Sequence, residues 1–206
     1  FEEAAATGSA YARAVAFAPR NPAAYLYGEE NSKWFTLFPE WDYRFLVDEG
    51  AGGTDMDSRL AFFYVATVNT PAMVWRIPGV GSQYAIIARD SNGEWFNGDQ
   101  TYTLRIPAGV PAKNFWSFVI YDPQTRSMLQ TPDQKFPSVN SMREGLQTEP
   151  DGSVLLTIAP QPPLEREGNW IQSREGKGWF AILRLYGPEE AWFDKTWRPG
   201  EIELTP

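Results

Sequence analysis

The opening residues of the chain have the spacing of a helix. Alanine and other apolar residues recur along EEAAATGSAYARAVAFAP, and Glu2 and Glu3 occupy the first turn, where acidic side chains complement the helix dipole. Pro19 does not continue a helix and marks its end. The pattern predicts a helix of about 15 residues within the range 2–18.

A second helical pattern follows the flexible GAGG stretch at residues 50–53. Along SRLAFFYVATV, large side chains and one threonine recur at i, i+3, i+4 and i+7, the spacing of one helix face. Thr54 or Asp55 can cap the start of this helix, and Pro71 stops it. We therefore expect a helix over roughly residues 56–69.

From residue 80 onward, the period of the pattern changes from 3.6 to 2, as in β-strands. Six β-branched or aromatic runs are separated by turn signals, and they read YAIIARD, TYTLRIP, NFWSFVIYD, SMLQT, GSVLLTIAP and GWFAILRLYG. We predict a mainly β (α+β) fold, an antiparallel jelly-roll-like β-sandwich with two N-terminal helices packed on it. The predicted domains are residues 1–54, with the first helix and an aromatic-rich connection, and residues 55–206, the sandwich with one leading helix.

The composition excludes several kinds of site. The sequence has no cysteine and no histidine, which excludes thiolate metal sites, disulfides, cysteine nucleophiles and the usual near-neutral general base. Any metal would be a hard cation held by oxygen, and neither a metal site nor a cofactor is expected. The net charge of −8 argues against a nucleic-acid surface. No apolar stretch approaches the roughly 20 residues of a transmembrane helix.

Aromatic residues are unusually frequent, at 15% of the chain with nine tryptophans. Large rings suit a β-rich core, but they also form stacking platforms for sugars and other flat ligands. The composition leaves both interpretations open.

Three long runs occur in order in the second half: DSNGEWFNGDQTYTLRIPAGVPAKNFWSFVIYDPQTRSMLQT, PDGSVLLTIAPQPPLEREGNWIQSREGKGWFAILRLYGP and WFDKTWRPGEIEL. Together with SRLAFFYVATVNTPAM, these runs resemble the bacterial domain-of-unknown-function family 1214 over residues 55–206. The resemblance implies a β-sandwich of jelly-roll type and no established activity. It also implies a preceding domain of unknown function numbered 1254, which this chain lacks, and an exported protein of the periplasm or envelope.

The turn after the aromatic strand is the first candidate site. Asp122 and Pro123 begin a turn in which the carboxylate accepts backbone N–H groups, and Thr125 and Ser127 can bond within the same turn. Alternatively, Arg126 presents its guanidinium to an anionic or hydroxylated ligand. The strand itself contributes further candidate ligand contacts, Trp116 and Tyr121.

The second candidate site combines NWIQ with the last long strand. Asn169 and Trp170 follow a proline-rich loop, and Arg184 and Tyr186 lie two positions apart, on one face of their strand. A buried Arg184 would need a carboxylate partner, for which the candidates are Asp90, Asp122 and Asp194. Such a pair is either structural or part of a polar pocket.

The same three aspartates, Asp90, Asp122 and Asp194, are the candidate catalytic residues if the protein is an enzyme. Two converging carboxyl groups would suit glycoside hydrolysis. The Asp90 and Asp151 segments, DSNG and DG, are better explained as turns, and neither forms a calcium-binding loop. Lys113 lies at the mouth of a strand, where a rim position or a ligand contact would explain it.

Three functions remain open from the sequence. The leading hypothesis is an envelope-associated β-sandwich module that binds a small polar ligand, including a carbohydrate, or docks on a partner domain. The alternatives are a carbohydrate-active hydrolase using paired carboxylates and a structural or self-assembling subunit.

The predicted partner is a domain that precedes the chain in a longer protein, or a second copy of the chain. The chain begins at Phe1 and not at methionine, which indicates processing or a longer parent protein. Six aromatic residues lie close together in the segment after the first helix, which suggests that some face this partner. They are Tyr25, Tyr27, Trp34, Phe35, Phe38 and Trp41.

Overall fold

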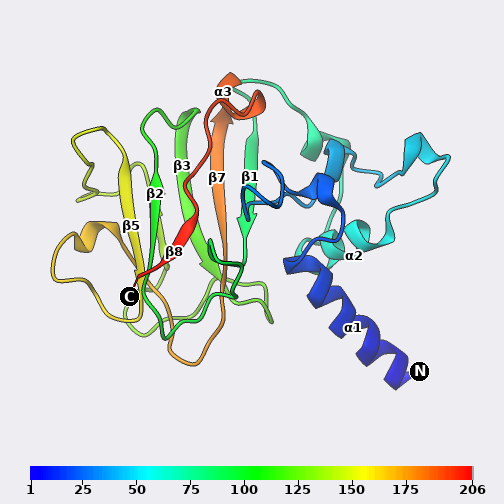
Figure 1. The fold of residues 1–206 in the computed structure, drawn as a ribbon, viewed down its shortest axis with the longest axis horizontal. Coiled ribbons are helices and arrows are strands. Elements are labelled where there is room, and N and C mark those ends of the chain that lie inside the picture. Colours follow the sequence, from blue (N-terminus) through cyan, green and yellow to red (C-terminus); the bar gives the residue numbers. More distant parts are fainter. Residues whose placement is uncertain (206) are drawn as a thin grey trace. The chain divides into compact units, whose positions relative to one another are not determined.

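The computed structural model describes residues 1–205, and the chain divides into two compact units. The first comprises residues 1–76, and the second begins at Ile77. Figure 1 traces the chain from the first helix, in blue, to the last strand, in red. No helix in the described part of the chain is long and apolar enough to cross a membrane.

The first unit contains two α-helices that pack against each other, α1 (Glu2–Phe17) and α2 (Met56–Val65). The predicted first helix is confirmed. The second starts as expected, because the Asp55 side chain accepts a hydrogen bond from Ser58 N at 3.0 Å. It ends four residues earlier than expected, because Ala66 is already extended and Asn69 bonds the carbonyl of Tyr43.

Short 3-10 helices punctuate the rest of the first unit, at Pro22–Ala24, Pro39–Trp41, Asp48–Gly50 and Pro71–Val74. Its core includes a cluster of three rings, Phe38, Phe45 and Phe62, with Phe38 and Phe62 centred 4.8 Å apart.

Most of the six clustered aromatic residues are core residues of this chain. Tyr25, Trp34, Phe35 and Phe38 are buried, whereas Tyr27 and Trp41 are half-buried. The chain itself therefore covers four of the six rings, and the proposed partner surface is reduced to two half-buried ones.

The second unit is built from two four-stranded β-sheets (Figure 1). The first sheet has the order β1-β7-β3-β4, with strands Ser82–Ile87, Phe180–Pro188, Ala112–Tyr121 and Ser138–Asn140. The second has the order β6-β5-β2-β8, with strands Trp170–Gln172, Val154–Ala159, Tyr102–Ile106 and Ile202–Leu204. A 3-10 helix, η5 (Glu167–Asn169), precedes β6, and the short helix α3 (Glu190–Phe193) follows β7.

Five of the six predicted strand runs form strands, which confirms the mainly β fold. The run SMLQT is an exception, because it makes only an isolated bridge, Tyr121 to Met128. The three-residue strands β4, β6 and β8 are too short for a periodic pattern to reveal them. The β5–β6 pair is parallel, so the unit is not wholly antiparallel as predicted.

The two faces of the first sheet differ because side chains alternate along each strand. One face carries side chains such as Phe118, Leu183 and Ile87, all fully buried. On the other face, residues at one end are buried, including Val119 and Ile182. The opposite end is half-buried or exposed; we call it the open face, and it comprises Ser82, Tyr84, Phe115, Ser117, Arg184 and Tyr186.

Candidate functional site

Arg184 lies at the centre of the open face, on β7, one of the two inner strands of the first sheet. It pairs in register with Tyr84 of β1 on one side and with Ser117 of β3 on the other. Its Nη1 donates a hydrogen bond to Tyr121 Oη at 2.5 Å. The guanidinium carbon lies 5.7 Å from the centre of the Tyr84 ring and 5.4 Å from that of Tyr121, within cation–π range.

The expected carboxylate partner of Arg184 is not found. Among residues 1–205, no carboxylate forms an ion pair with this guanidinium, which is half-buried rather than fully buried. Aromatic faces and one phenol oxygen replace the carboxylate, because two tyrosines from neighbouring strands reach the same point. In the described part of the chain, this cation is thus held by rings and a phenol oxygen and not by an ion pair.

Aromatic side chains flank Arg184 along the open face. The rings of Phe115 and Tyr186 stack with centroids 4.1 Å apart and planes at 15°. Tyr84 is 41% exposed, and its hydroxyl lies 2.7 Å from Ser82 Oγ. The arrangement offers a fixed cation, phenol and serine hydroxyls and ring surfaces, which suits a ligand with polar groups and a flat apolar side.

Three of the sequence-predicted ligand residues, Tyr121, Arg184 and Tyr186, are brought together here. Tyr84, Phe115 and Ser82 join them but were not among the candidates. Their positions follow from the cross-strand register, which places Tyr84 opposite Arg184 and Phe115 opposite Tyr186. A single strand pattern does not contain that pairing.

The predicted turn after β3 is confirmed. Asp122 Oδ1 accepts hydrogen bonds from the N–H groups of Gln124 and Thr125, at 2.7 and 3.3 Å. Arg126 has a left-handed backbone with φ of 60°, and its guanidinium donates to the Gln124 carbonyl. Asp122 Oδ2 also lies 3.6 Å from Lys177 Nζ, and both residues line an open cavity.

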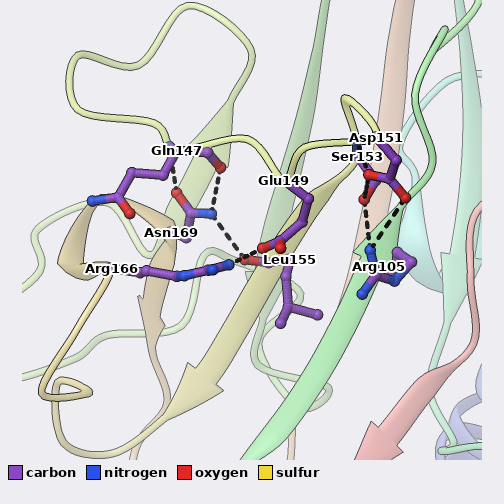
Figure 2. A network of polar contacts seen from close by, with 8 residues as sticks. All are labelled: Arg105, Gln147, Glu149, Asp151, Ser153, Leu155, Arg166 and Asn169. Atoms are coloured by element: carbon purple, nitrogen blue, oxygen red, sulfur yellow. Dashed lines mark hydrogen bonds and ion pairs between the residues drawn. The ribbon is translucent and has the colours of Figure 1, made fainter.

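The side chains of Asn169 and Trp170 form hydrogen bonds with the backbone of neighbouring segments. Figure 2 shows the Asn169 side chain between two segments: its Nδ2 donates to the carbonyls of Gln147 and Leu155, and its Oδ1 accepts from Gln147 N. Both atoms are occupied, and the residue is 1% exposed. Trp170 is also buried, with Nε1 donating to the Ala159 carbonyl at 2.9 Å.

Figure 2 also shows two ion pairs, one beside Asn169 and the other apart from it. Arg166 pairs with Glu149, and Arg105 lies 3.8 Å from Asp151 while donating to Ser153 Oγ. The Ser153 hydroxyl in turn donates to Asp151 and holds the pKa of that carboxyl below its usual value. The network fastens the segment before β5 to the segment before β6.

The two remaining candidates from β3 lie apart from Arg184. Trp116 is on the buried face of the sheet and is 5% exposed. Lys113 is exposed at the start of β3.

The candidate catalytic carboxylates stabilise separate turns. Asp90 Oδ1 accepts from the N–H groups of Asn92 and Glu94, and Asp122 caps the turn after β3. Asp194 accepts from Thr196, whose hydroxyl hydrogen bond lowers the pKa of the Asp194 carboxyl. Within residues 1–205, no group of three or more acidic residues is placed to hold a metal ion.

Two solved structures are similar to this chain. The VPA0106 protein from Vibrio parahaemolyticus is 22% identical with a TM-score of 0.57, and the match covers 82% of this chain and 41% of that one. This likeness shows a shared fold. A second, an uncharacterized protein from Burkholderia cenocepacia, is 22% identical with a TM-score of 0.38, over 60% of this chain and 29% of that one. The chain therefore spans less than half the length of either protein.

No curated protein matches the chain. A family model does match, over residues 81–190, and its description is Protein of unknown function (DUF1214). This range runs from just before β1 into α3, so it contains both sheets except for β8. The resemblance predicted from the sequence is confirmed, and the chain belongs to the DUF1214 family.

Proposed function

We propose that the second unit is a binding module whose open face receives a small polar ligand, with a sugar or sugar acid as the favoured class. The observation that carries the proposal is Arg184, a half-buried cation fixed by the Tyr121 hydroxyl and by the rings of Tyr84 and Tyr121, with no carboxylate paired to it in residues 1–205. Removing a charge partly from water costs free energy, and a ligand anion or hydroxyl would offset that cost.

The chemistry of the open face supports this ligand class. A guanidinium has five N–H donors, and Tyr121 accepts from one nitrogen, so donors remain for a ligand. Tyr84 and the stacked Phe115–Tyr186 pair supply ring surface, on which the apolar side of a sugar packs.

A binding role has more support than hydrolysis. Paired-carboxylate catalysis needs two acidic groups that converge, with the pKa of one raised. Asp90, Asp122 and Asp194 each accept hydrogen bonds from their own turns, and the pKa of Asp194 is lowered and not raised.

For the fold, the proposal includes a sandwich of jelly-roll type. Successive strands alternate between the two sheets: β1 lies in the first, β2 in the second, β3 and β4 in the first, β5 and β6 in the second. The strands β7 and β8 continue that alternation. Repeated crossing between sheets is the feature that jelly rolls share.

A partner domain or a second copy of the chain is part of the same proposal, as is export to the periplasm. The VPA0106 protein is more than twice as long as the matched region, which supports a role beside another domain. Light scattering at two protein concentrations tests self-association: a mass that stays that of a monomer excludes the second copy.

The test of ligand binding is an NMR titration of the isotope-labelled chain with glucuronate and, separately, with glucose. We expect shifts in Tyr84, Ser117 and Tyr186, and a stronger response to glucuronate because its carboxylate can meet Arg184. Arg184→Gln should abolish the preference for glucuronate over glucose, and Tyr84→Ala should weaken the binding of both sugars.

Arg198→Gln is the matched control, because Arg198 is an exposed arginine outside the strands. The proposal fails if neither sugar shifts the open face, or if Arg184→Gln and Arg198→Gln respond alike.

A further inference from the structure

An open cavity of about 250 Å³ lies at the end of β3, and none of the residues of the open face lines it. Its wall comes from three segments: the turn after β3, the residues that follow it, and the loop before β7. The lining residues are Asp122, Thr125, Ser127, Met128, Leu129, Gln130, Arg174 and Lys177. The volume lies below the roughly 300–1,000 Å³ of pockets for drug-sized ligands, which limits the occupant to a small molecule.

The cavity carries a net positive charge in a chain whose net charge is −8. Arg174 and Lys177 contribute two cations and Asp122 one anion. Lys177 Nζ lies 3.6 Å from Asp122 Oδ2, beyond hydrogen-bond distance, and within residues 1–205 this ammonium makes no hydrogen bond. Its three N–H donors are therefore available to an anion.

The loop that carries both cations is fixed against the segment before β2. Gly98 N donates to the Lys177 carbonyl, Ser173 Oγ donates to the Gly98 carbonyl, and Gly176 N donates to Asp99 Oδ1. A Cβ atom at residue 98 would collide with the carbonyl oxygens of Arg174 and Lys177, so glycine is required for this approach. The backbone that carries the two cations is thus held in place before any ligand binds.

The turn after β3 supplies hydroxyl groups to the cavity wall. Thr125 Oγ1 and Ser127 Oγ lie 2.8 Å apart, and each retains hydrogen-bonding capacity beyond that contact. Asp122 is already engaged by two backbone N–H groups, so its carboxylate helps fix this wall. The cavity therefore offers a ligand both cations and hydroxyl groups.

We infer that this cavity binds a small hydroxylated carboxylate, with the carboxylate on Lys177 and Arg174 and the hydroxyls toward Thr125 and Ser127. The site is separate from the one proposed at Arg184, since the two have no residue in common. A variant of one site therefore leaves the other in place, and each inference can fail alone.

The test is calorimetric and NMR titration of the full chain with gluconate. Sorbitol, of similar size but with an alcohol in place of the carboxylate, and inorganic phosphate are titrated alongside. We expect gluconate to bind more tightly than sorbitol or phosphate and to shift Thr125, Ser127 and the 174–177 loop. Lys177→Gln and Arg174→Gln should each lower the affinity for gluconate by about tenfold, because each removes a hydrogen bond to a charged group.

Lys195→Gln is the charge-matched control, because Lys195 is exposed and does not line the cavity. Asp122→Asn gives a prediction of opposite sign: the amide oxygen can still cap the turn, but the loss of negative charge should tighten gluconate binding severalfold.

Several results would overturn the inference. They are no gluconate binding at millimolar concentration, equal binding of gluconate and sorbitol, tighter binding of phosphate than of gluconate, and equal losses in the Lys177 and Lys195 variants. Weaker binding in Asp122→Asn would also contradict it. The Arg184→Gln variant should bind gluconate in this cavity as the wild type does.

Discussion

The two faces of the first sheet are made by alternate residues of the same strands, yet they differ in chemistry. On the buried face, Phe118 and Leu183 lie opposite each other and are 0% exposed. One residue along each strand, Ser117 lies opposite Arg184 on the open face, where both are half-buried. The buried face resembles a protein core, whereas the open face, at one end of the other side of the sheet, carries a cation, hydroxyls and rings.

Because successive side chains of a strand point to opposite sides of the sheet, one strand can supply core residues to one side and candidate ligand contacts to the other. The buried face removes apolar surface from water, which stabilises the fold by about 25 cal/mol per Å². The open face holds Arg184 in a defined position at the expense of part of its hydration. We expect substitutions on the first face to change the free energy of unfolding and those on the second to change ligand binding.

The largest expected effect is that of Phe118→Ala on the buried face. Removing a fully buried ring leaves a cavity in the packed core and should cost about 3–5 kcal/mol of unfolding free energy. Urea denaturation measures the loss. Ser117→Ala, one residue away on the open face, is the control and should change stability by less than about 0.5 kcal/mol. Equal losses of unfolding free energy in the two variants would contradict the proposed division between a stabilising face and a binding face.

Tyr121→Phe should have a smaller effect, because it removes the Oη that accepts from Arg184 but retains the ring. The half-buried guanidinium can replace this bond with water, so we expect a loss of about 0.5–1.5 kcal/mol. The variant should also weaken glucuronate binding, because Arg184 is then held less firmly. Unchanged stability together with unchanged binding would show that the Tyr121 hydroxyl does not position Arg184.

Arg184→Met tests the open face directly. Methionine retains an unbranched apolar chain and removes a cation whose hydration is incomplete, so the stability should stay within about 1 kcal/mol of the wild type. The response to glucuronate should nevertheless be lost. A destabilisation comparable to that of Phe118→Ala would mean that Arg184 is a structural residue, contrary to the comparison.

Lowering the pH should have the smallest effect on the two faces of the first sheet, because its four strands contain no carboxylate that could be protonated. Acid should instead lower stability through carboxylates that cap helices, such as Asp55 at the start of α2. Burial raises the pKa of the Asp55 carboxyl, but hydrogen bonds from Ser58 and Asn21 outweigh burial and hold the pKa below its usual value. The charged form therefore stabilises the fold above the unfolded pKa, and this contribution is lost as the pH falls through the folded pKa.

We expect wild type to exceed Asp55→Asn in stability by less than about 1 kcal/mol at pH 5, with the difference shrinking as the pH falls below about 4. Urea denaturation at pH 5, 4 and 3 measures this, and Glu175→Gln, at an exposed position, serves as the control. A difference that stays constant down to pH 3 would rule out the Asp55 charge as its source.

Much of the fold was predictable from local patterns. The first helix, the Asp55 cap, five strands and the turns at Asp90, Asp122 and Asp151 all depend on side chains acting within a few residues of their own position. The three-residue strands escaped prediction because their conformation is set by the neighbours with which they pair. For the same reason, the parallel β5–β6 pair was not anticipated.

The candidate sites were predicted in part. Tyr121 was a candidate of the first predicted site and Arg184 and Tyr186 were candidates of the second, and the structure brings these three side chains together. The carboxylate partner that a buried Arg184 would need is not among Asp90, Asp122 and Asp194, which cap turns elsewhere. The cations of the cavity, Arg174 and Lys177, lie some 50 residues after Asp122 in the chain, and no local pattern connects them.

By itself, the sequence determined the family, the mainly β fold and the chemistry that is excluded, because residue types and periodicity are local properties. The tertiary structure decided which side chains meet. Register placed Tyr84 beside Arg184, and the contact between Gly98 and the 174–177 loop set both cations against the Asp122 turn. Both arrangements join residues far apart in the chain, and such pairings are chosen by the packing and hydrogen bonding of the whole unit.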